Sequence, residues 1–180
     1  MDDDEDPADG NFAPARADWT ATVAATESDW EAVVDLRMRV FVDEQGVPEH
    51  LELDEHDEDP LDSDVDHLLV RDTARGGEAV ATARLRAVDA DDYGALDAGT
   101  ERVAKVERVV VARDRRGEGW GARVMGAVED RARGRGLAEA VLHAQTHAAG
   151  FYERLDYAVD DALGTFDEDG IEHVRMRRRL

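Results

Sequence analysis

Cysteine is absent from the 180-residue sequence, which excludes a disulfide framework, a thiolate zinc site and a cysteine nucleophile. Long apolar runs are absent as well, so no segment approaches the length of a transmembrane helix. The first residues, Met1 to Asp6, are acidic, whereas a secretory signal begins with basic residues. We therefore expect a soluble, cytoplasmic protein of one domain, long enough to bury a hydrophobic core.

Basic residues are scarce. The chain has 44 Asp and Glu against 22 Lys and Arg, a formal net charge of −22, and Lys105 is its only lysine. Acid spread along a whole chain is typical of a solvating surface in a salt-rich cytoplasm, and it predicts a salt-adapted, haloarchaeal-like source. We expect no nucleic-acid partner, because phosphate contacts require a basic face. Without cysteine or closely spaced histidines and carboxylates, we also expect no metal site.

Hydrophobic periodicity predicts a mixed α/β domain at residues 19–180, behind a disordered acidic tail at residues 1–18. The expected order is β-α-α-β-β-β-α-β-α-β-β, a mixed sheet with helices on its faces. The predicted strands span residues 19–25, 67–71, 79–88, 103–112, 137–144, 157–166 and 171–179. The predicted helices span residues 28–39, 41–45, 119–133 and 148–155.

Two features near the N-terminus carry more specific predictions. Ser28 and Glu31 have the spacing of a capping box, so Ser28 is the expected N-cap of the first helix. Residues 49–66 form a very acidic loop. Its charge fits attraction of a cationic amine, and it fits the general acidity of the surface equally well.

The segment from Val106 to Gly121 joins a β-branched apolar run, an arginine cluster and three alternating glycines at the start of a predicted helix. A strand that feeds a glycine-rich turn at a helix N-terminus presents free backbone N–H groups to an anion. The charge of the chain also reverses here, since residues 102–135 hold ten cations and five anions. The segment therefore predicts a site for a phosphorylated ligand.

Three ligands and one structural explanation compete for this turn. A mononucleotide phosphate loop fails because no Gly-Lys-Ser/Thr follows. The dinucleotide pattern G-x-G-x-x-G/A is met by Gly117 to Ala122, but too few residues follow to build the second half of a dinucleotide domain. A tightly packed helix start explains the glycines but leaves the adjacent arginines unexplained. The third ligand is coenzyme A.

Residues Arg116 to Gly121 fit every fixed position of the pattern Arg/Gln-x-x-Gly-x-Gly/Ala. This stretch resembles the pyrophosphate-binding motif of the GNAT superfamily of N-acetyltransferases. Residues 39–48 and 143–157 resemble two further segments of its ElaA-like branch, so the resemblance covers residues 19–180. Asp156 departs from it, because the family usually has glycine before that aromatic residue; the departure affects a turn.

The resemblance implies the GNAT fold, a mostly antiparallel mixed sheet flanked by helices, and transfer of an acetyl group from acetyl-CoA to a primary amine in a ternary complex. The main chain of Val109 and Val111 would pair with the pantetheine arm, and an N–H near Val109 would hold the developing oxyanion. The implied cofactor-binding residues are Val109, Val110, Val111, Arg115, Arg116, Gly117, Glu118, Gly119, Trp120, Gly121 and Ala122.

Two residues are expected to handle protons. Deprotonating an amine of pKa about 10.4 at pH 7 costs about 4.6 kcal/mol, so a base is useful. Glu107 on the central strand is the candidate base, and a solvated carboxylate or an ion pair explains it equally well. Tyr152 matches the family position that protonates the leaving thiolate, with an ordinary packed aromatic as the alternative.

The acceptor half is less well defined. Glu44 and Gln45 sit where the ElaA-like branch shapes the acceptor pocket, and a helix-end cap explains them nearly as well. We expect a small-molecule or peptide amine as partner and no association with a membrane. A homodimer is one expected oligomeric state. The alternative function is a non-catalytic acyl-CoA sensor or interaction module on the same fold.

Overall fold

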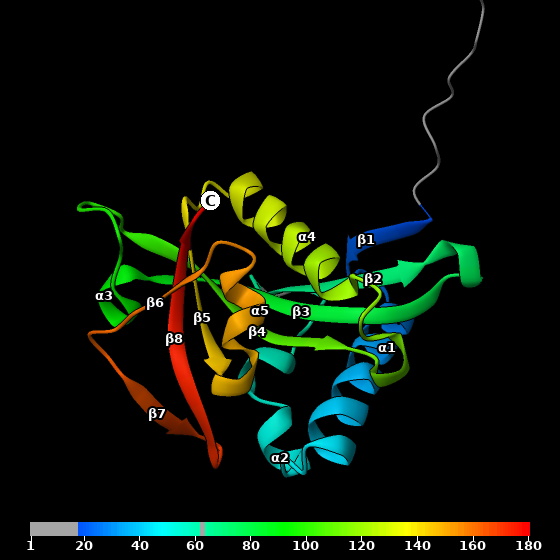
Figure 1. Ribbon diagram of the computed structural model, residues 1–180. Coiled ribbons are helices and arrows are strands. Elements are labelled where there is room, and N and C mark those ends of the chain that lie inside the picture. Colours follow the sequence, from blue (N-terminus) through cyan, green and yellow to red (C-terminus); the bar gives the residue numbers. More distant parts are fainter. Residues whose placement is uncertain (1–17, 62–63) are drawn as a thin grey trace, which may run out of the picture.

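The computed structural model describes residues 18–61 and 64–180, which are organised around one sheet of eight strands (Figure 1). The strands follow the order β1-β2-β3-β4-β5-β8-β6, and β7 pairs with β8 on the same edge as β6. Every pairing is antiparallel except that of β4 with β5. The predicted mixed sheet is therefore confirmed.

The described strands are β1 (Trp19–Val23), β2 (Asp66–Asp72), β3 (Glu78–Asp89), β4 (Arg102–Val111), β5 (Glu139–Gln145), β6 (Ala158–Val159), β7 (Thr165–Glu168) and β8 (Ile171–Arg179). The α-helices are α1 (Glu27–Arg37), α2 (Glu49–Glu52), α3 (Ala90–Tyr93), α4 (Trp120–Gly134) and α5 (Ala149–Glu153). A π-helix, Met38–Glu44, follows α1 directly. Short 3₁₀ turns occupy Glu55–Asp57, Thr73–Arg75, Arg113–Arg115 and Thr146–Ala148.

Helices α1 and α4 cover opposite faces of the sheet (Figure 1). Strand β2 shows the reason, because successive side chains of a strand point to opposite faces. Leu68 packs in one cluster with Val124 and Val128 of α4, and Leu69 packs in another with Leu36 of α1. Strands that are apolar at successive positions thus form the middle layer between two helical layers.

The first helix has its N-cap two residues before the predicted one. Thr26 Oγ1 accepts a hydrogen bond from the Asp29 N–H at 3.1 Å and donates to the Asp29 carboxylate at 2.8 Å. The predicted cap at Ser28 with Glu31 is therefore wrong, because Thr26 and Asp29 close the helix start instead. A separate helix at residues 41–45 is also wrong, since α1 continues into the π-helix without a break.

Buried ion pairs anchor the acidic segment 49–66, and part of it is helical as α2. The Arg37 guanidinium lies 2.5 Å from the Glu52 carboxylate and 2.9 Å from that of Asp57, and all three side chains are buried. A buried charge is costly unless it is paired and hydrogen-bonded. The carboxylates of Glu52 and Asp57 therefore hold Arg37 away from solvent. The prediction that residues 49–66 form a solvent-exposed loop is wrong for these two residues.

The C-terminal hairpin is confirmed at its turn, where β7 and β8 pair from Glu168 and Ile171 outward. Its first strand is divided, because the chain runs outside β6 and β7 at residues 160–164. The predicted tail at residues 1–18 lies outside the described residues except for Asp18. None of the helices in the described ranges is long and apolar enough to cross a membrane.

Strands β4 and β5 separate shortly after they meet, and this separation positions the site. They pair only from Ala104 to Val106 on β4. Beyond that point β4 contains a bulge. The two residue steps from Thr82 to Arg84 on β3 lie opposite the three steps from Glu107 to Val110 on β4, and Arg108 has a φ of 52°. A bulge bends and twists its strand. The second half of β4 thus keeps β3 as its partner and leaves its other edge free.

Candidate active site

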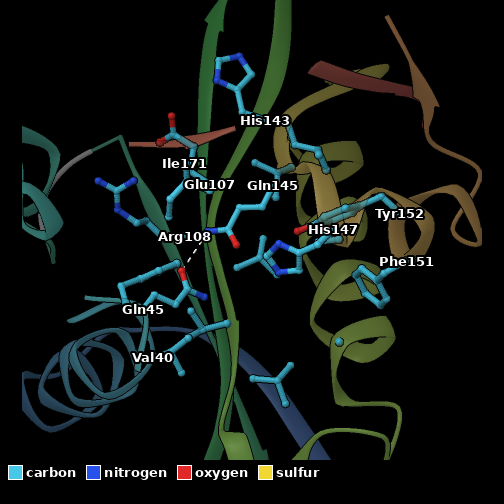
Figure 2. A pocket seen from close by; sticks show the side chains of 18 of the residues that line it. Val40, Gln45, Glu107, Arg108, His143, Gln145, His147, Phe151, Tyr152 and Ile171 are labelled. Carbon is cyan, nitrogen blue, oxygen red and sulfur yellow. Dashed lines mark hydrogen bonds between the residues drawn. The ribbon is translucent and has the colours of Figure 1, made fainter. Parts of the chain in front are cut away.

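A cavity of about 900 Å³ opens where β4 and β5 diverge (Figure 2). Its walls come from the second half of β4, the end of β5, the start of α4, the π-helix, α5 and the turn between β7 and β8. The glycine-rich turn closes one end. The other end is polar, and it includes Lys105, Glu107, His143 and Glu168.

The glycines of the turn are required by its backbone and by its neighbours. Gly117 and Gly119 have φ angles of 82° and 84°, in the left-handed region that other residues rarely adopt. Gly121 is helical, but a Cβ there would lie 2.9 Å from the ring of Phe151. Among the described residues, the backbone N–H groups of residues 117–122 have no protein acceptor. They form a row of free donors at the N-terminus of α4, as predicted for an anion site.

The free edge of β4 faces the same cavity. The Ala112 N–H donates to the Val80 carbonyl of β3 at 2.9 Å. Since successive residues of a strand direct their backbone groups to opposite sides, Val111 points its N–H and carbonyl away from β3, and the carbonyl accepts a hydrogen bond from Arg116 Nε at 3.3 Å. Val109, Val110 and Val111 all line the cavity. An extended ligand could therefore add to this edge as a strand would.

The two arginines predicted to contact phosphate differ in position. Arg116 lines the cavity, and its guanidinium pairs with Glu44 at 2.6 and 2.9 Å. Arg115 does not line the cavity and is 2 % exposed. Carboxylates of Asp72, Glu78 and Glu118 surround its guanidinium at 2.6 to 3.1 Å.

The prediction that Arg115 contacts phosphate is therefore wrong. Carboxylates already neutralise its charge, and it supports the glycine-rich turn from outside the cavity. Glu118 was predicted to contribute its backbone N–H, which is among the free donors of the turn; its carboxylate lies outside the cavity lining and also accepts from the Trp120 indole N–H at 2.9 Å. Both residues support the turn with their side chains. Trp120 itself lines the cavity.

The predicted acceptor residues Glu44 and Gln45 end the π-helix and line the cavity. The Gln145 side-chain amide donates to the Gln45 oxygen at 3.0 Å, which joins the π-helix to β5 across the opening (Figure 2). Single-turn π-helical insertions occur frequently at functional sites. The Glu44 pairing with Arg116 also brings a predicted acceptor residue into contact with a predicted donor residue.

Glu107 lines the cavity, but two arginines hold its carboxylate. Arg84 donates to it at 3.0 Å, and Arg86 donates to both oxygens at 2.8 and 3.0 Å. Burial alone would raise the pKa of Glu107, but these hydrogen bonds and charges outweigh burial and lower it to about 2. Glu107 is therefore ionised at neutral pH and is a weak proton acceptor. The ion pair that the sequence left open is present.

Tyr152 extends from α5 into the cavity (Figure 2). Burial raises the pKa of Tyr152 to about 12, so the phenol keeps its proton throughout the neutral range. Within the described ranges nothing hydrogen-bonds to its hydroxyl group. The packed-aromatic alternative is also met in part, because the ring has edge contacts with Phe151 and Tyr157.

Sequence reasoning missed Lys105 and Glu168 as cavity residues. Alternation along β4 places Lys105 on the same face as Glu107, which is a signal that the sequence contains. Glu168 pairs with His143 at 2.9 Å, and no local pattern links these residues of β7 and β5. Among the described residues, no group of three His, Asp or Glu side chains is arranged to hold a metal ion.

A family model described as the acetyltransferase (GNAT) family matches residues 30–157, which is well over half of the chain. The chain belongs to the GNAT acetyltransferase family. It is 34 % identical to YyaT of Bacillus subtilis over 155 residues, which are 86 % of this chain and 92 % of YyaT. It is 32 % identical to the uncharacterized N-acetyltransferase YjcF of the same organism over 158 residues, or 88 % of this chain and 98 % of YjcF.

Solved structures agree with this assignment. An acyl-CoA N-acyltransferase from Pseudomonas aeruginosa superposes with a TM-score of 0.67 at 29 % identity, over 89 % of this chain and 98 % of that one. Escherichia coli ElaA superposes with a TM-score of 0.65 at 28 % identity, over the same shares. The GNAT fold predicted from the resemblance is confirmed. ElaA is one neighbour among several of similar likeness, so the comparison shows the family and does not single out a branch.

Proposed function

We propose that this GNAT protein moves the acetyl group of acetyl-CoA to a primary amine of a small molecule or peptide, by direct attack in a ternary complex. The observation that carries the proposal is the junction between the free edge of β4 and the row of free N–H groups at the start of α4. An extended ligand that ends in a pyrophosphate fits this junction, because the strand edge offers main-chain partners and the helix N-terminus favours an anion.

The donor half of the site would use the turn from Arg116 to Ala122 for the pyrophosphate, and Val109 to Val111 for the extended arm. Arg116 would add a charge-assisted hydrogen bond, in exchange for its present pair with Glu44. Acetyl-CoA would supply the acetyl group as a thioester. A backbone N–H near Val109 would stabilise negative charge on the carbonyl oxygen.

Tyr152 would stabilise the departing thiolate. A phenol with a pKa of about 12 does not give up its proton to a thiolate whose pKa is about 8.5. We therefore assign Tyr152 a hydrogen bond to the developing negative charge, in place of full proton transfer. Such a bond needs a free hydroxyl group that reaches the cavity, which is the situation of Tyr152.

Glu107 would position the acceptor amine as a hydrogen-bond acceptor. Its two arginine partners and its pKa of about 2 make it a poor base for an amine. Its carboxylate, two residues before Val109 on β4, would accept a hydrogen bond from the amine beside the thioester, while the two arginines balance its charge. The ammonium form would lose one proton to water in the cavity, and the neutral amine would attack the carbonyl carbon. The C–S bond would then break, the attacking nitrogen would pass a second proton through water to the thiolate, and the thiol would be released.

Release of free thiol from acetyl-CoA in the presence of an amine panel tests the proposal, with the acetylated amine identified by mass spectrometry. The wild-type protein is expected to release thiol only when an amine is present. Tyr152→Phe is expected to lower kcat by about 10- to 100-fold, as the loss of one hydrogen bond to a charged group implies.

Tyr157→Phe is the matched control, because Tyr157 is a buried tyrosine outside the cavity lining. It should leave kcat unchanged. A thermal shift with acetyl-CoA but no turnover with any amine would favour the sensor function. Stabilisation by NADH and not by acetyl-CoA would overturn the donor assignment.

A further inference from the structure

Lys105 has no place in the donor site, yet it lines the cavity. It lies on β4 two residues before Glu107 and is 3 % exposed. Its ammonium nitrogen has no hydrogen-bond partner among the described residues. The ring of Tyr93 on α3 has its centre 4.8 Å from this nitrogen, which gives a cation–π contact but leaves the N–H groups without an acceptor oxygen.

The acidic groups around Lys105 already have other partners. Glu107 is held by two arginines of β3, and Glu168 of β7 is held by His143 of β5 at 2.9 Å. Burial lowers the pKa of Lys105 to about 8, against the opposing charges of Glu107 and Glu168. At pH 7 the side chain is therefore mostly an ammonium ion with free donors.

An unpaired buried ammonium is unusual beside the paired charges of the same cavity. Glu52 meets Arg37 at 2.5 Å and Glu107 meets Arg86 at 2.8 Å. Removing an unpaired charge from water costs free energy that a methionine of similar size would not cost. An acidic group on a ligand would supply the missing acceptor.

Position along β4 separates Lys105 from the donor phosphates. A regular strand rises about 3.3 Å per residue, so the backbone of Lys105 lies at most about 20 Å from that of Val111, the last residue of β4 before the glycine-rich turn, and the bulge shortens this distance. Val109, next to the proposed reaction point, lies about 13 Å away on the same scale. The Lys105 ammonium thus belongs to the acceptor end of the cavity.

We propose that Lys105 binds an acidic group of the acceptor, and that the acceptor is an amine that also carries a carboxylate or phosphate at the far end of its chain. This inference rests on the proposed acetyl transfer. A diamine would place its second ammonium against Lys105 and would be repelled.

Four matched series of acceptors test the inference with the full-length protein: alkylamines, amino carboxylates, amino phosphonates and diamines, each with three to six carbons. An amine with a terminal acid is expected to give the highest kcat/KM, and the diamine of the same length the lowest. Comparison of carboxylate with phosphonate identifies the acidic group. A preference for diamines, or no preference for an acid at any length, would overturn the inference.

Lys105→Met tests whether this residue causes the preference. It is expected to raise KM for the acid-bearing amine by about 10- to 100-fold and so to remove most of the preference for that amine over the alkylamine of the same length. Lys105→Arg keeps the charge and should restore part of the affinity. An equal loss of kcat for every amine would instead make Lys105 a base, and an unchanged KM would make it structural; either result refutes the proposal.

Chemical labelling distinguishes a failure of this inference from a failure of acetyl transfer. Lys105 is the only lysine, so reductive methylation of its side chain can be followed by peptide mass mapping. An alkyl carboxylate or phosphonate, which does not consume the aldehyde as an amine would, should slow its methylation, and a neutral alcohol of equal length should not. If no amine is acetylated, the transferase proposal fails while protection still supports an anion site; turnover without protection by any of these acids leaves the transferase and removes the Lys105 assignment.

Discussion

Replacing Lys105 by methionine should make the protein more stable, even though it removes a residue that we assign to substrate binding. The pKa of Lys105 in the folded protein is about 8, against 10.5 for the free side chain. At about 1.36 kcal/mol per pKa unit, the buried charge costs about 3 kcal/mol at pH 7. Methionine fills a similar volume and keeps a favourable contact with the ring of Tyr93.

The pH dependence has a definite sign. Because folding lowers the pKa of Lys105, the unfolded chain binds more protons between pH 8 and pH 10.5, and the stability of the wild type rises through that window. The advantage of Lys105→Met is therefore greatest below pH 8 and disappears above pH 10.5. About 3 kcal/mol in a chain of this length corresponds to an increase in Tm of about 6 to 12 °C at pH 7.

Urea unfolding followed by tryptophan fluorescence at pH 7, 9 and 10.5, at constant salt, measures this difference. Arg39→Met is the matched control, since Arg39 is 53 % exposed in its pair with Asp35 and should change stability by less than about 0.5 kcal/mol. An unfolding midpoint of Lys105→Met equal to that of the wild type at pH 7 would refute the presence of a buried unpaired ammonium. A gain in stability at pH 10.5 as large as the gain at pH 7 would refute it as well.

Four further predictions follow from single contacts. Glu44→Gln frees Arg116 and should tighten acetyl-CoA binding by about two- to fivefold in calorimetry, because an exposed ion pair contributes little; weaker binding would show that Glu44 does not compete for this arginine. Glu107→Gln should lower stability by about 2 kcal/mol in urea unfolding, less than for most buried pairs because Arg84 keeps Asp54; wild-type stability would contradict the network. Asp156 has a φ of 65°, so Asp156→Gly should raise stability by about 1 kcal/mol, and a loss would show that the turn depends on the carboxylate. With a net charge of −22, acetyl-CoA should bind more weakly at low salt than in molar salt, and tighter binding on dilution would show that the local arginines dominate.

The donor half of the site was largely predictable because it is local in sequence. Its backbone donors and strand edge all lie between Val109 and Ala122, and glycine spacing reports directly on the φ angles that such a turn requires. What failed within this segment was the side-chain direction of Arg115. It directly precedes Arg116, which lines the cavity, and only its burial and its pairing with Glu118 show that it turns away from the cavity.

The acceptor half was much less predictable because four distant segments build it. The π-helix and the Gln45–Gln145 contact bring together residues 100 positions apart. The ion pairs of Glu107 required knowledge that β3 places Arg84 opposite Glu107 and Arg86 opposite Lys105, within reach of the same carboxylate. Capping was misassigned because Thr26 with Asp29 and Ser28 with Glu31 share the same spacing, and the folded chain uses Thr26.

By itself the sequence determined the mixed sheet, most of its strands and the glycine-rich turn before α4, because periodicity, β-branched runs and glycine spacing act over short stretches of chain. It also determined that Lys105 is the only lysine. Only the tertiary structure decided that this lysine is buried without a partner, that Arg116 faces the cavity while Arg115 does not, and that Glu107 is neutralised. Burial and pairing depend on which strands become neighbours, and that is a property of the folded chain.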